Sequence, residues 1–303
     1  MRTLLFILLS ICCFASAGQQ QSLRYQLQKG ETYMLRFISE GQSLITLKDK
    51  KVLLTSTRET LLELKVVGEK RHRYVFEARY KKVSHILHSD ATHKEYVLSN
   101  TDSSGKELSA YIIKKLIDRP FSIHMNDLGY IDQIKGIDEM IGTEVADRFK
   151  QFPDSVQSMI ASDASRSFGN LALKNTLQPY THIYAPDGTT HWRTASQVTK
   201  PSQFNIVMYI GMMETSRLKL VAGGDLFIQE DHYVGAGISE GSKMLGKIRS
   251  DIELDVRTGW PSTTFLVQDL AGETTETRSG QATTKFPCRL HCEIKYKVWK
   301  VDR

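Results

Sequence analysis

The sequence is poor in cysteine and has no long apolar run beyond its first residues. Only four of its 303 residues are cysteine, and two of these, Cys12 and Cys13, lie in the N-terminal apolar run. A glycine-rich phosphate-binding loop, a dinucleotide fingerprint and a Cys–His nucleophile pair are also missing. These absences argue against nucleotide-dependent chemistry, against cysteine catalysis, and against a transmembrane segment after the leader.

Positive charge is spread along the chain rather than concentrated. Lys and Arg total 40 against 34 Asp and Glu, which gives a formal net charge of +6 at pH 7. No stretch interleaves arginine with aromatic residues, as a nucleic-acid groove does. We therefore expect no nucleic-acid partner. The basic excess is interpreted as solvated strand edges and helix faces, with contact to an anionic membrane or polysaccharide as the alternative.

Residues 1–17 have the three parts of a secretory signal peptide. Arg2 provides a positive charge, an apolar run follows, and the small residues Ala15 and Ala17 occupy the positions that a signal peptidase reads. We predict cleavage after Ala17 and export to the periplasm, to the outer membrane or to the outside of the cell. The alternative is a lipid-modified cysteine, which needs a small residue before it, whereas Ile11 precedes Cys12.

The other two cysteines, Cys288 and Cys292, lie in a segment that alternates apolar and polar residues. This period-two pattern, from Phe286 to Val298, predicts a strand with one solvated face. Four residues of extended strand span about 13 Å, whereas a disulfide needs Cα atoms within about 7 Å. We therefore expect no disulfide, two reduced core thiols, and no zinc site, because no second Cys/His pair has matching spacing.

Strand signals dominate residues 18–135. Runs from Leu23 to Ser99 alternate apolar and charged residues between short turns, which is typical of an antiparallel meander. Residues 107–118 predict a helix that ends before Pro120. Residues 121–134 predict a hairpin, because Asn126, Asp127 and Gly129 suit a tight turn.

Helical spacing of apolar residues marks residues 136–178 as different, and strands return over residues 179–303. Within the last part, Gln203–Met213 is apolar on both faces, which predicts a central strand covered on both sides. We predict an α+β protein that is mainly antiparallel β: a curved sheet, a half-barrel or two β-rich halves, with a helical insert. The predicted divisions are the signal peptide (1–17), an N-terminal β-rich half (18–135), the insert (136–178) and a C-terminal β-rich half (179–303).

One short pattern points to catalysis. Residues Gly237–Gly241 match the G-x-S-x-G motif of serine hydrolases, with Ser239 in the nucleophile position and His291 downstream. That motif works on a strand-to-helix turn above a parallel sheet, whereas the surrounding pattern here is antiparallel strand. The competing interpretation is an ordinary glycine-containing loop.

Histidines and carboxylates give no metal or cofactor signal. His85 and His88 point to opposite faces of a strand, and His182 and His191 have no carboxylate pair nearby. Asp251, Glu253 and Asp255 form an acidic row on one strand face, and we interpret them as solvated. We therefore expect neither a metal site nor a cofactor.

Three stretches form a set by their order and spacing. They are Lys29–Tyr33, Phe121–Gly129 continuing through Gly136–Met140, and Asp255–Pro261. Together they resemble exported proteins of Bacteroidota grouped as domain of unknown function 6263. The resemblance implies an envelope location and a strand-rich fold, and it brings no catalytic residue.

These observations favour a non-catalytic envelope protein that binds a lipid, another apolar ligand or an envelope protein partner, because a curved sheet closed by helices makes an apolar concavity. Five apolar residues are candidate wall residues of such a site, with packed core as the competing interpretation: Leu62, Phe76, Phe204, Met208 and Ile210. The alternatives are a secreted hydrolase that uses Ser239 and a purely structural or assembly protein.

Overall fold

The structure is a computed structural model that describes residues 24–47, 50–100, 108–184, 203–213, 217–235, 238–279 and 281–301. Side chains are described for these residues except 203–213, 217 and 230–235. The predicted signal peptide, its cleavage site at Ala17 and the histidine His191 lie outside the described residues.

Eleven strands and four helices make up the described part of the chain. The strands are β1 (Thr32–Leu47), β2 (Lys50–Lys70), β3 (Arg73–Ser89), β4 (Lys94–Ser99), β5 (Pro120–Asn126), β6 (Ile131–Lys135), β7 (Gln203–Met213), β8 (Arg217–Gly235), β9 (Ile238–Asp255), β10 (Pro261–Arg278) and β11 (Thr284–Lys300). The helices are α2 (Leu108–Leu116), α3 (Ile137–Arg148), α4 (Asp154–Phe168) and α5 (Asn170–Thr181).

All the strands belong to one antiparallel sheet. Their order is β6-β5-β3-β2-β1-β11-β10-β9-β8-β7, and β4 pairs with the far end of β3. The first and last strands are neighbours, with Tyr33 opposite Lys300, so the two β-rich parts of the chain join in a single sheet. The predicted fold class, mainly antiparallel β with a helical insert, is confirmed.

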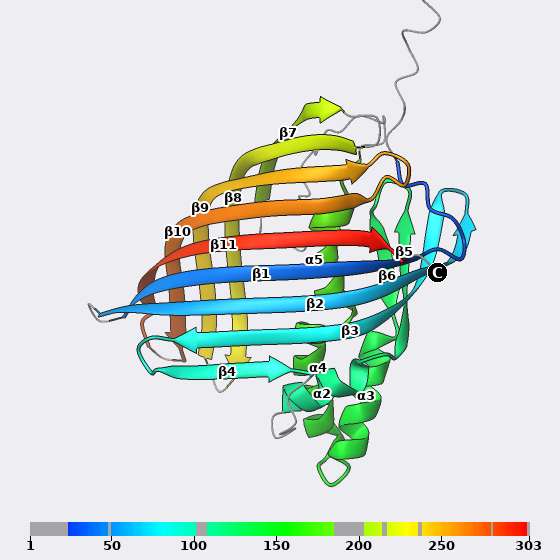
Figure 1. The fold of residues 1–303 in the computed structure, drawn as a ribbon. Helices are drawn as coiled ribbons and strands as arrows, with labels where there is room; N and C mark the ends of the chain where they lie inside the picture. The colour runs from blue at the N-terminus through cyan, green and yellow to red at the C-terminus, as the bar shows by residue number, and fades with distance from the viewer. Residues whose placement is uncertain are drawn as a thin grey trace, which may run out of the picture.

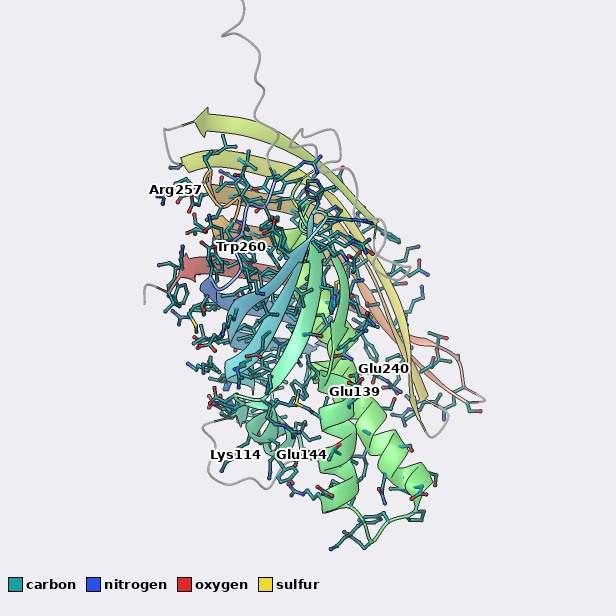
Figure 2. The ribbon with its side chains drawn as sticks, turned by 90° about the vertical axis from the view of Figure 1, so that its right-hand side faces the viewer. Lys114, Glu139, Glu144, Glu240, Arg257 and Trp260 are labelled. Atoms are coloured by element: carbon teal, nitrogen blue, oxygen red, sulfur yellow. The ribbon has the colours of Figure 1, made fainter. Side chains whose placement is uncertain are left out.

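The sheet is strongly curved. Figure 1 shows the long strands β8–β11 crossing the front of the molecule and bending at its left edge, so that the sheet wraps around α5. The side view in Figure 2 shows the same shell with the helices below it, at the opposite end from Trp260. The helical insert therefore covers part of the sheet's inner face, which is the face turned toward α5.

Alternation along the strands explains which residues form the core. In β1 the inner residues Tyr33, Leu35 and Phe37 are buried, and Arg36 between them is exposed. Their neighbours on β2, Leu62 and Leu64, are also buried. The period of two places every second side chain on the inner face, where burying apolar area stabilises the fold by about 25 cal/mol per Å².

Aromatic rings fill one end of the inner face. The ring of Trp260 lies 4.9 Å from that of Tyr25, 5.5 Å from Tyr33 and 6.2 Å from Phe76, and Tyr184 lies 5.4 Å from Tyr25. We call these five residues the aromatic cluster. Burial raises the pKa of the phenol groups of Tyr25 and Tyr184 well above the ordinary value, so both hydroxyls stay protonated.

Helix α5 is tied to this end of the sheet by specific hydrogen bonds. The Ile131 backbone N–H donates to Gln178 Oε1 at 2.9 Å, and the Tyr25 hydroxyl donates to the Thr181 carbonyl at 2.8 Å. The turn between β5 and β6 approaches so closely that a Cβ at Gly129 would lie 1.7 Å from the Thr181 oxygen. Gly129 also has φ +85°, which favours glycine.

One local expectation is wrong. Strand β7 stands at the end of the strand order and not in the middle, because apolar residues on both faces of a short run do not specify its neighbours.

Candidate functional site

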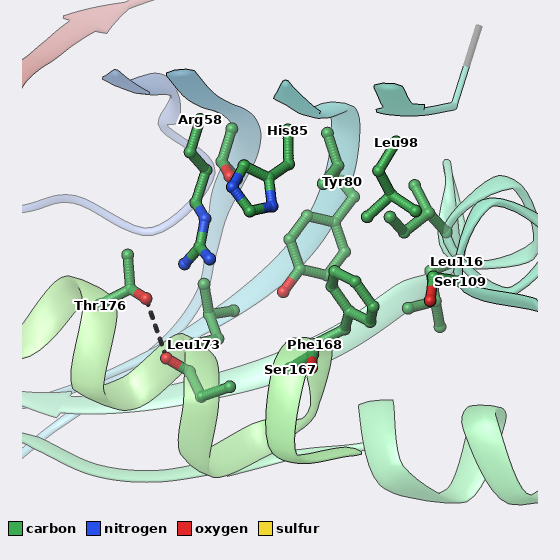
Figure 3. Close-up of a pocket in the computed structure, with 14 residues that line it drawn as sticks. Arg58, Tyr80, His85, Leu98, Ser109, Leu116, Ser167, Phe168, Leu173 and Thr176 are labelled. Atoms are coloured by element: carbon green, nitrogen blue, oxygen red, sulfur yellow. Dashed lines mark hydrogen bonds between the residues drawn. The ribbon is translucent and has the colours of Figure 1, made fainter. Parts of the chain in front are cut away.

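A cavity of about 300 Å³ lies between the inner face of the sheet and the helices (Figure 3). Strands β2, β3 and β4 border it on one side, and helices α2, α4 and α5 border it on the other. Its lining residues are Arg58, Thr60, Tyr80, Val83, His85, Leu98, Ser109, Ile113, Leu116, Ser167, Phe168, Ala172, Leu173 and Thr176. This volume is at the lower end of the range for small-molecule sites.

Apolar side chains make up half of the lining. They come from every element around the cavity except β2: Val83, Leu98, Ile113, Leu116, Phe168, Ala172 and Leu173. Ile113, Leu116 and Leu173 are buried, while Leu98 and Phe168 are half-buried. The helices therefore bring apolar surface to the sheet without closing the space completely.

Hydroxyl groups supply most of the remaining polarity. Five line the cavity: Thr60, Tyr80, Ser109, Ser167 and Thr176. The Thr176 hydroxyl donates to the Ala172 carbonyl at 2.9 Å, the dashed line in Figure 3. Burial raises the pKa of the Tyr80 phenol, and the negative charge of Asp138 raises it further, so Tyr80 is a neutral hydroxyl.

Arg58 and His85 are the charged and titratable groups at one end of the cavity. They lie opposite each other on β2 and β3, and Figure 3 shows the guanidinium and the imidazole side by side. A β-bulge makes this possible: Leu61 pairs with Lys82 but Leu62 pairs with Tyr80, so the strand phase changes and His85 turns inward.

The surroundings of these two groups shift their pKa values in the same direction. Partial desolvation at the cavity lowers the pKa of the Arg58 guanidinium, although Arg58 as a whole is an exposed residue. Burial also lowers the pKa of His85, and the positive charge of Arg58 lowers it further. At neutral pH the pair therefore carries one positive charge, on Arg58.

No acidic side chain is among the described residues that line the cavity. The described residues also contain no group of three or more His, Cys, Asp or Glu that could hold a metal ion. The arrangement offers an apolar pocket, several hydroxyls and one cationic end. Such a set can hold and orient a ligand, but it lacks a paired acid and base for proton transfer.

Ser239 and His291, the candidate hydrolase residues, are not brought together. Ser239 is a residue of β9 opposite Thr277 of β10, while His291 is opposite Asp269, which lies eight residues earlier in β10. Gly237 of the motif lies outside the described residues. The imidazole of His291 instead contacts the Asp269 carboxylate at 2.7 Å, and this hydrogen bond raises its pKa.

The candidate wall residues divide into two groups. Leu62 and Phe76 are 0% and 1% exposed in the packed core and do not line the cavity. Phe204, Met208 and Ile210 belong to β7, and their side chains lie outside the described residues.

The remaining titratable side chains considered in the sequence lie apart from one another. His88 is opposite Thr55, three positions along the ladder from the Arg58–His85 pair, and it points to the other face of the sheet. The acidic row lies on β9, where Glu253 is 3.6 Å from Lys219 and Asp255 is 3.6 Å from Arg257.

The two cysteines of the last strand are free thiols on the inner face. Cys288 Sγ lies 3.3 Å from Ser43 Oγ, and Cys292 Sγ lies 3.3 Å from Ser39 Oγ. Burial raises the pKa of the Cys292 thiol, and this effect outweighs the hydrogen bond with Ser39.

Sequence reasoning missed Arg58 although the sequence contains a signal for it. Arg58 and Thr60 are in phase with the buried residues Leu62, Leu64 and Val66 along one strand, and this places a charged group on the inner face. A charge at an inner position is rare without a partner. The signal was therefore available from strand phase alone.

The fold and the cavity define a curved antiparallel sheet protein with a ligand-sized space beneath inserted helices. The sequence model of the family of unknown function DUF6263 matches residues 71–261, and the chain belongs to this family. The predicted resemblance to this family is confirmed over these residues. No curated protein matches the chain.

Solved structures give only distant likenesses. A structure described as lipid–protein interactions in lipovitellin aligns over 92% of this chain with a TM-score of 0.46 and 9% identity, and this chain covers 26% of that one. An outer membrane channel from Pseudomonas putida F1 aligns over 94% of this chain and 100% of its own, with a TM-score of 0.23 and 8% identity. At these scores neither likeness carries an argument about function.

Among the described helices, none combines the length and the apolar character that a membrane crossing requires.

Proposed function

We propose that this protein is an exported, non-catalytic binding protein that holds a lipid or another apolar ligand in the cavity between the sheet and the helices. One observation supports this most directly: a space of about 300 Å³ lies between the sheet and the helices, and half of the residues that line it are apolar. Apolar walls with a few polar groups at defined positions are typical of small-molecule sites.

Binding has better support than catalysis. The residues of the hydrolase alternative are eight ladder positions apart on adjacent strands, and Ser239 is part of a strand. The cavity contains hydroxyls but no carboxylate in its described lining, so no nucleophile there has a general base beside it other than His85.

Export is part of the proposal. It is supported by the N-terminal sequence, in which Arg2, an apolar run and the small residues up to Ala17 form a secretory signal. The family resemblance extends this to the envelope of a Bacteroidota cell. A binding protein there meets lipids of the membrane as its nearest apolar ligands, and assembly with an envelope protein is the alternative role.

The experiment is a fluorescence titration of the purified protein with N-phenyl-1-naphthylamine, a neutral probe that brightens in apolar sites. We expect saturable binding to the unaltered protein. Ala172→Phe places a ring into the cavity and should weaken binding at least tenfold. Leu171→Phe is the matched control, because Leu171 is 56% exposed on the same helix, and it should bind as the unaltered protein does.

Thr176→Leu is a smaller change to the same lining and should weaken binding in the same direction. Thermal denaturation of each variant identifies any variant that fails to fold. Absence of saturable binding, or equal binding by the Ala172 and Leu171 variants, would overturn the proposal. A stable envelope protein partner together with no probe binding would favour the assembly role.

A further inference from the structure

We propose that the ligand is a single-chain carboxylate, a fatty acid anion, with its head group on Arg58 and its chain along the cavity. This deepens the proposed function and rests on it. The observations that carry it are an arginine without a counter-charge at one end of the cavity and an apolar wall at the other.

Arg58 differs from Arg36 on β1 and from Arg119, which directly precedes β5, because each of those two pairs with a carboxylate. Arg36 pairs with Glu59 at 2.8 Å, and Arg119 pairs with Glu144 at 2.6 Å. In the described part of the chain, no ion pair or hydrogen bond joins the Arg58 guanidinium to another side chain. Although Arg58 is exposed as a whole, its side chain lines the cavity, so an anion bound there would give the guanidinium a charge partner.

The carboxylate nearest to Arg58 in sequence is already engaged elsewhere. Glu59 lies on the other strand phase, with its two oxygens 2.8 Å from Arg36 Nε and 2.6 Å from Lys82 Nζ. Burial alone would raise the pKa of Glu59, but these hydrogen bonds outweigh burial and lower it. Glu59 is therefore an ionised residue of the outer face. It does not neutralise Arg58, so the end of the cavity at Arg58 stays positively charged.

The cavity is charged and polar at one end and apolar at the other, which suits an amphipathic molecule. Figure 3 shows Arg58 and His85 toward one side, Phe168 in the middle, and Leu98 and Leu116 toward the other side. A guanidinium binds a planar carboxylate through two parallel hydrogen bonds. The volume of about 300 Å³ is at the lower limit for ligand sites, which favours one acyl chain over a lipid with several.

The charge of the site favours a carboxylate over a phosphate. Arg58, His85 and Tyr80 are the charged or titratable groups in the described lining, and His85 is neutral beside Arg58 at neutral pH. One positive charge matches one carboxylate, whereas a phosphate monoester carries nearly two negative charges at pH 7.

The test is displacement of N-phenyl-1-naphthylamine at pH 7.5 by decanoate, 1-decanol and decyl phosphate. Decanoate should bind the unaltered protein at least tenfold more tightly than 1-decanol, since hydrogen bonds to charged groups are the stronger ones. Arg58→Gln should remove this advantage and leave 1-decanol binding within about twofold. Arg249→Gln, at a site whose side chain is 74% exposed, makes the same charge change and should alter neither.

The outcomes separate this inference from the proposed function. If neither decanoate nor 1-decanol displaces the probe, the proposed function fails together with the inference. If both bind equally and Arg58→Gln changes neither, the cavity binds apolar chains as the proposed function states, and only the inference that the ligand is an anion is wrong. Tighter binding of decyl phosphate than of decanoate overturns the carboxylate assignment, and competition by inorganic phosphate alone overturns the need for a chain.

Discussion

The inner face of the sheet has two regions that differ sharply, although the same strands build both. In the aromatic cluster, rings pack around Trp260 and the hydroxyls have partners: Tyr25 donates to the Thr181 carbonyl, and Tyr184 donates to the Gly259 carbonyl. At the cavity, Arg58 has no described partner and apolar side chains border open space. On β2 the change occurs between the buried Leu62 and Arg58, four residues away.

The difference indicates that the two regions serve different purposes. Large rings at successive inner positions close one end and stabilise the fold. Threonine, arginine, valine and histidine at the following inner positions leave room beneath the helices. Replacing residues in each region, with matched controls, should separate stability from binding.

The largest expected effect is at the centre of the aromatic cluster. Trp260→Ala removes a buried ring that contacts three other rings, and it should lower the free energy of unfolding by about 4 kcal/mol. Trp299→Ala is the control, because Trp299 is 39% exposed, and it should cost less than about 1 kcal/mol. Urea denaturation measures both, and similar losses would contradict the role given to the cluster.

The next effect concerns the turn that holds α5 against the sheet. Gly129→Ala would place a Cβ 1.7 Å from the Thr181 carbonyl oxygen at a positive φ, and it should cost about 2 kcal/mol or more. Gly142→Ala is the control: no atom lies within 4 Å of a Cβ there, and alanine favours the helix by about 1 kcal/mol. The two variants should therefore shift the thermal midpoint in opposite directions, and a shared direction would be inconsistent with this packing.

A smaller effect is expected at the cavity wall. Phe168→Ala removes a half-buried ring that already borders open space, so it should cost less than about 2 kcal/mol, below the loss at Trp260. The same variant should weaken binding of N-phenyl-1-naphthylamine, because the ring forms part of the wall. A loss as large as that at Trp260 would mean that the cavity end is packed as tightly as the aromatic cluster.

The smallest effect is a dependence of stability on pH. Burial lowers the pKa of His85, with a further contribution from Arg58, and burial lowers the pKa of His182. The unfolded chain then binds protons at a higher pH than the folded chain, so stability is complete above pH 6.5 and falls as the pH decreases below it. The urea midpoint should drop between pH 7.5 and 5.5.

Variants assign that drop to the two imidazoles. His85→Gln and His182→Gln should each make the drop smaller, while His93→Gln, in an exposed turn, should leave it unchanged. His291 works in the opposite sense, since its raised pKa stabilises the fold at low pH and that contribution is lost as the pH rises. An unchanged drop in both buried-histidine variants would contradict the burial of these groups.

Much of the fold could be predicted because its signals are local. Alternation from Phe286 to Val298 specifies β11, and helical spacing after Gly136 specifies the insert. The edge position of β7 could not be predicted, since the partners of a strand depend on segments far away in sequence. For the same reason the pairing of β1 with β11, which joins the two halves, was not visible from local pattern.

For the candidate site, the sequence predicts only which face of each strand points inward, and not which inner residues line the cavity. Leu62 lies two residues from Thr60 on the same face, yet Leu62 is packed in the core and Thr60 lines the cavity. Which inner positions stay open is decided by residues of α2, α4 and α5, which contact the sheet only after folding. The bulge beside Tyr80, which turns His85 inward, likewise depends on the pairing of β2 and β3.

The central claim is that an acyl chain occupies the cavity with its head group at Arg58. A crystal structure with 10-bromodecanoate tests it directly, because the bromine position can be located by anomalous scattering. The account predicts bromine beside Leu98 and Leu116 and the carboxylate within hydrogen-bond distance of the Arg58 guanidinium. Bromine on the exposed surface around Leu245, with nothing bound between sheet and helices, would contradict it.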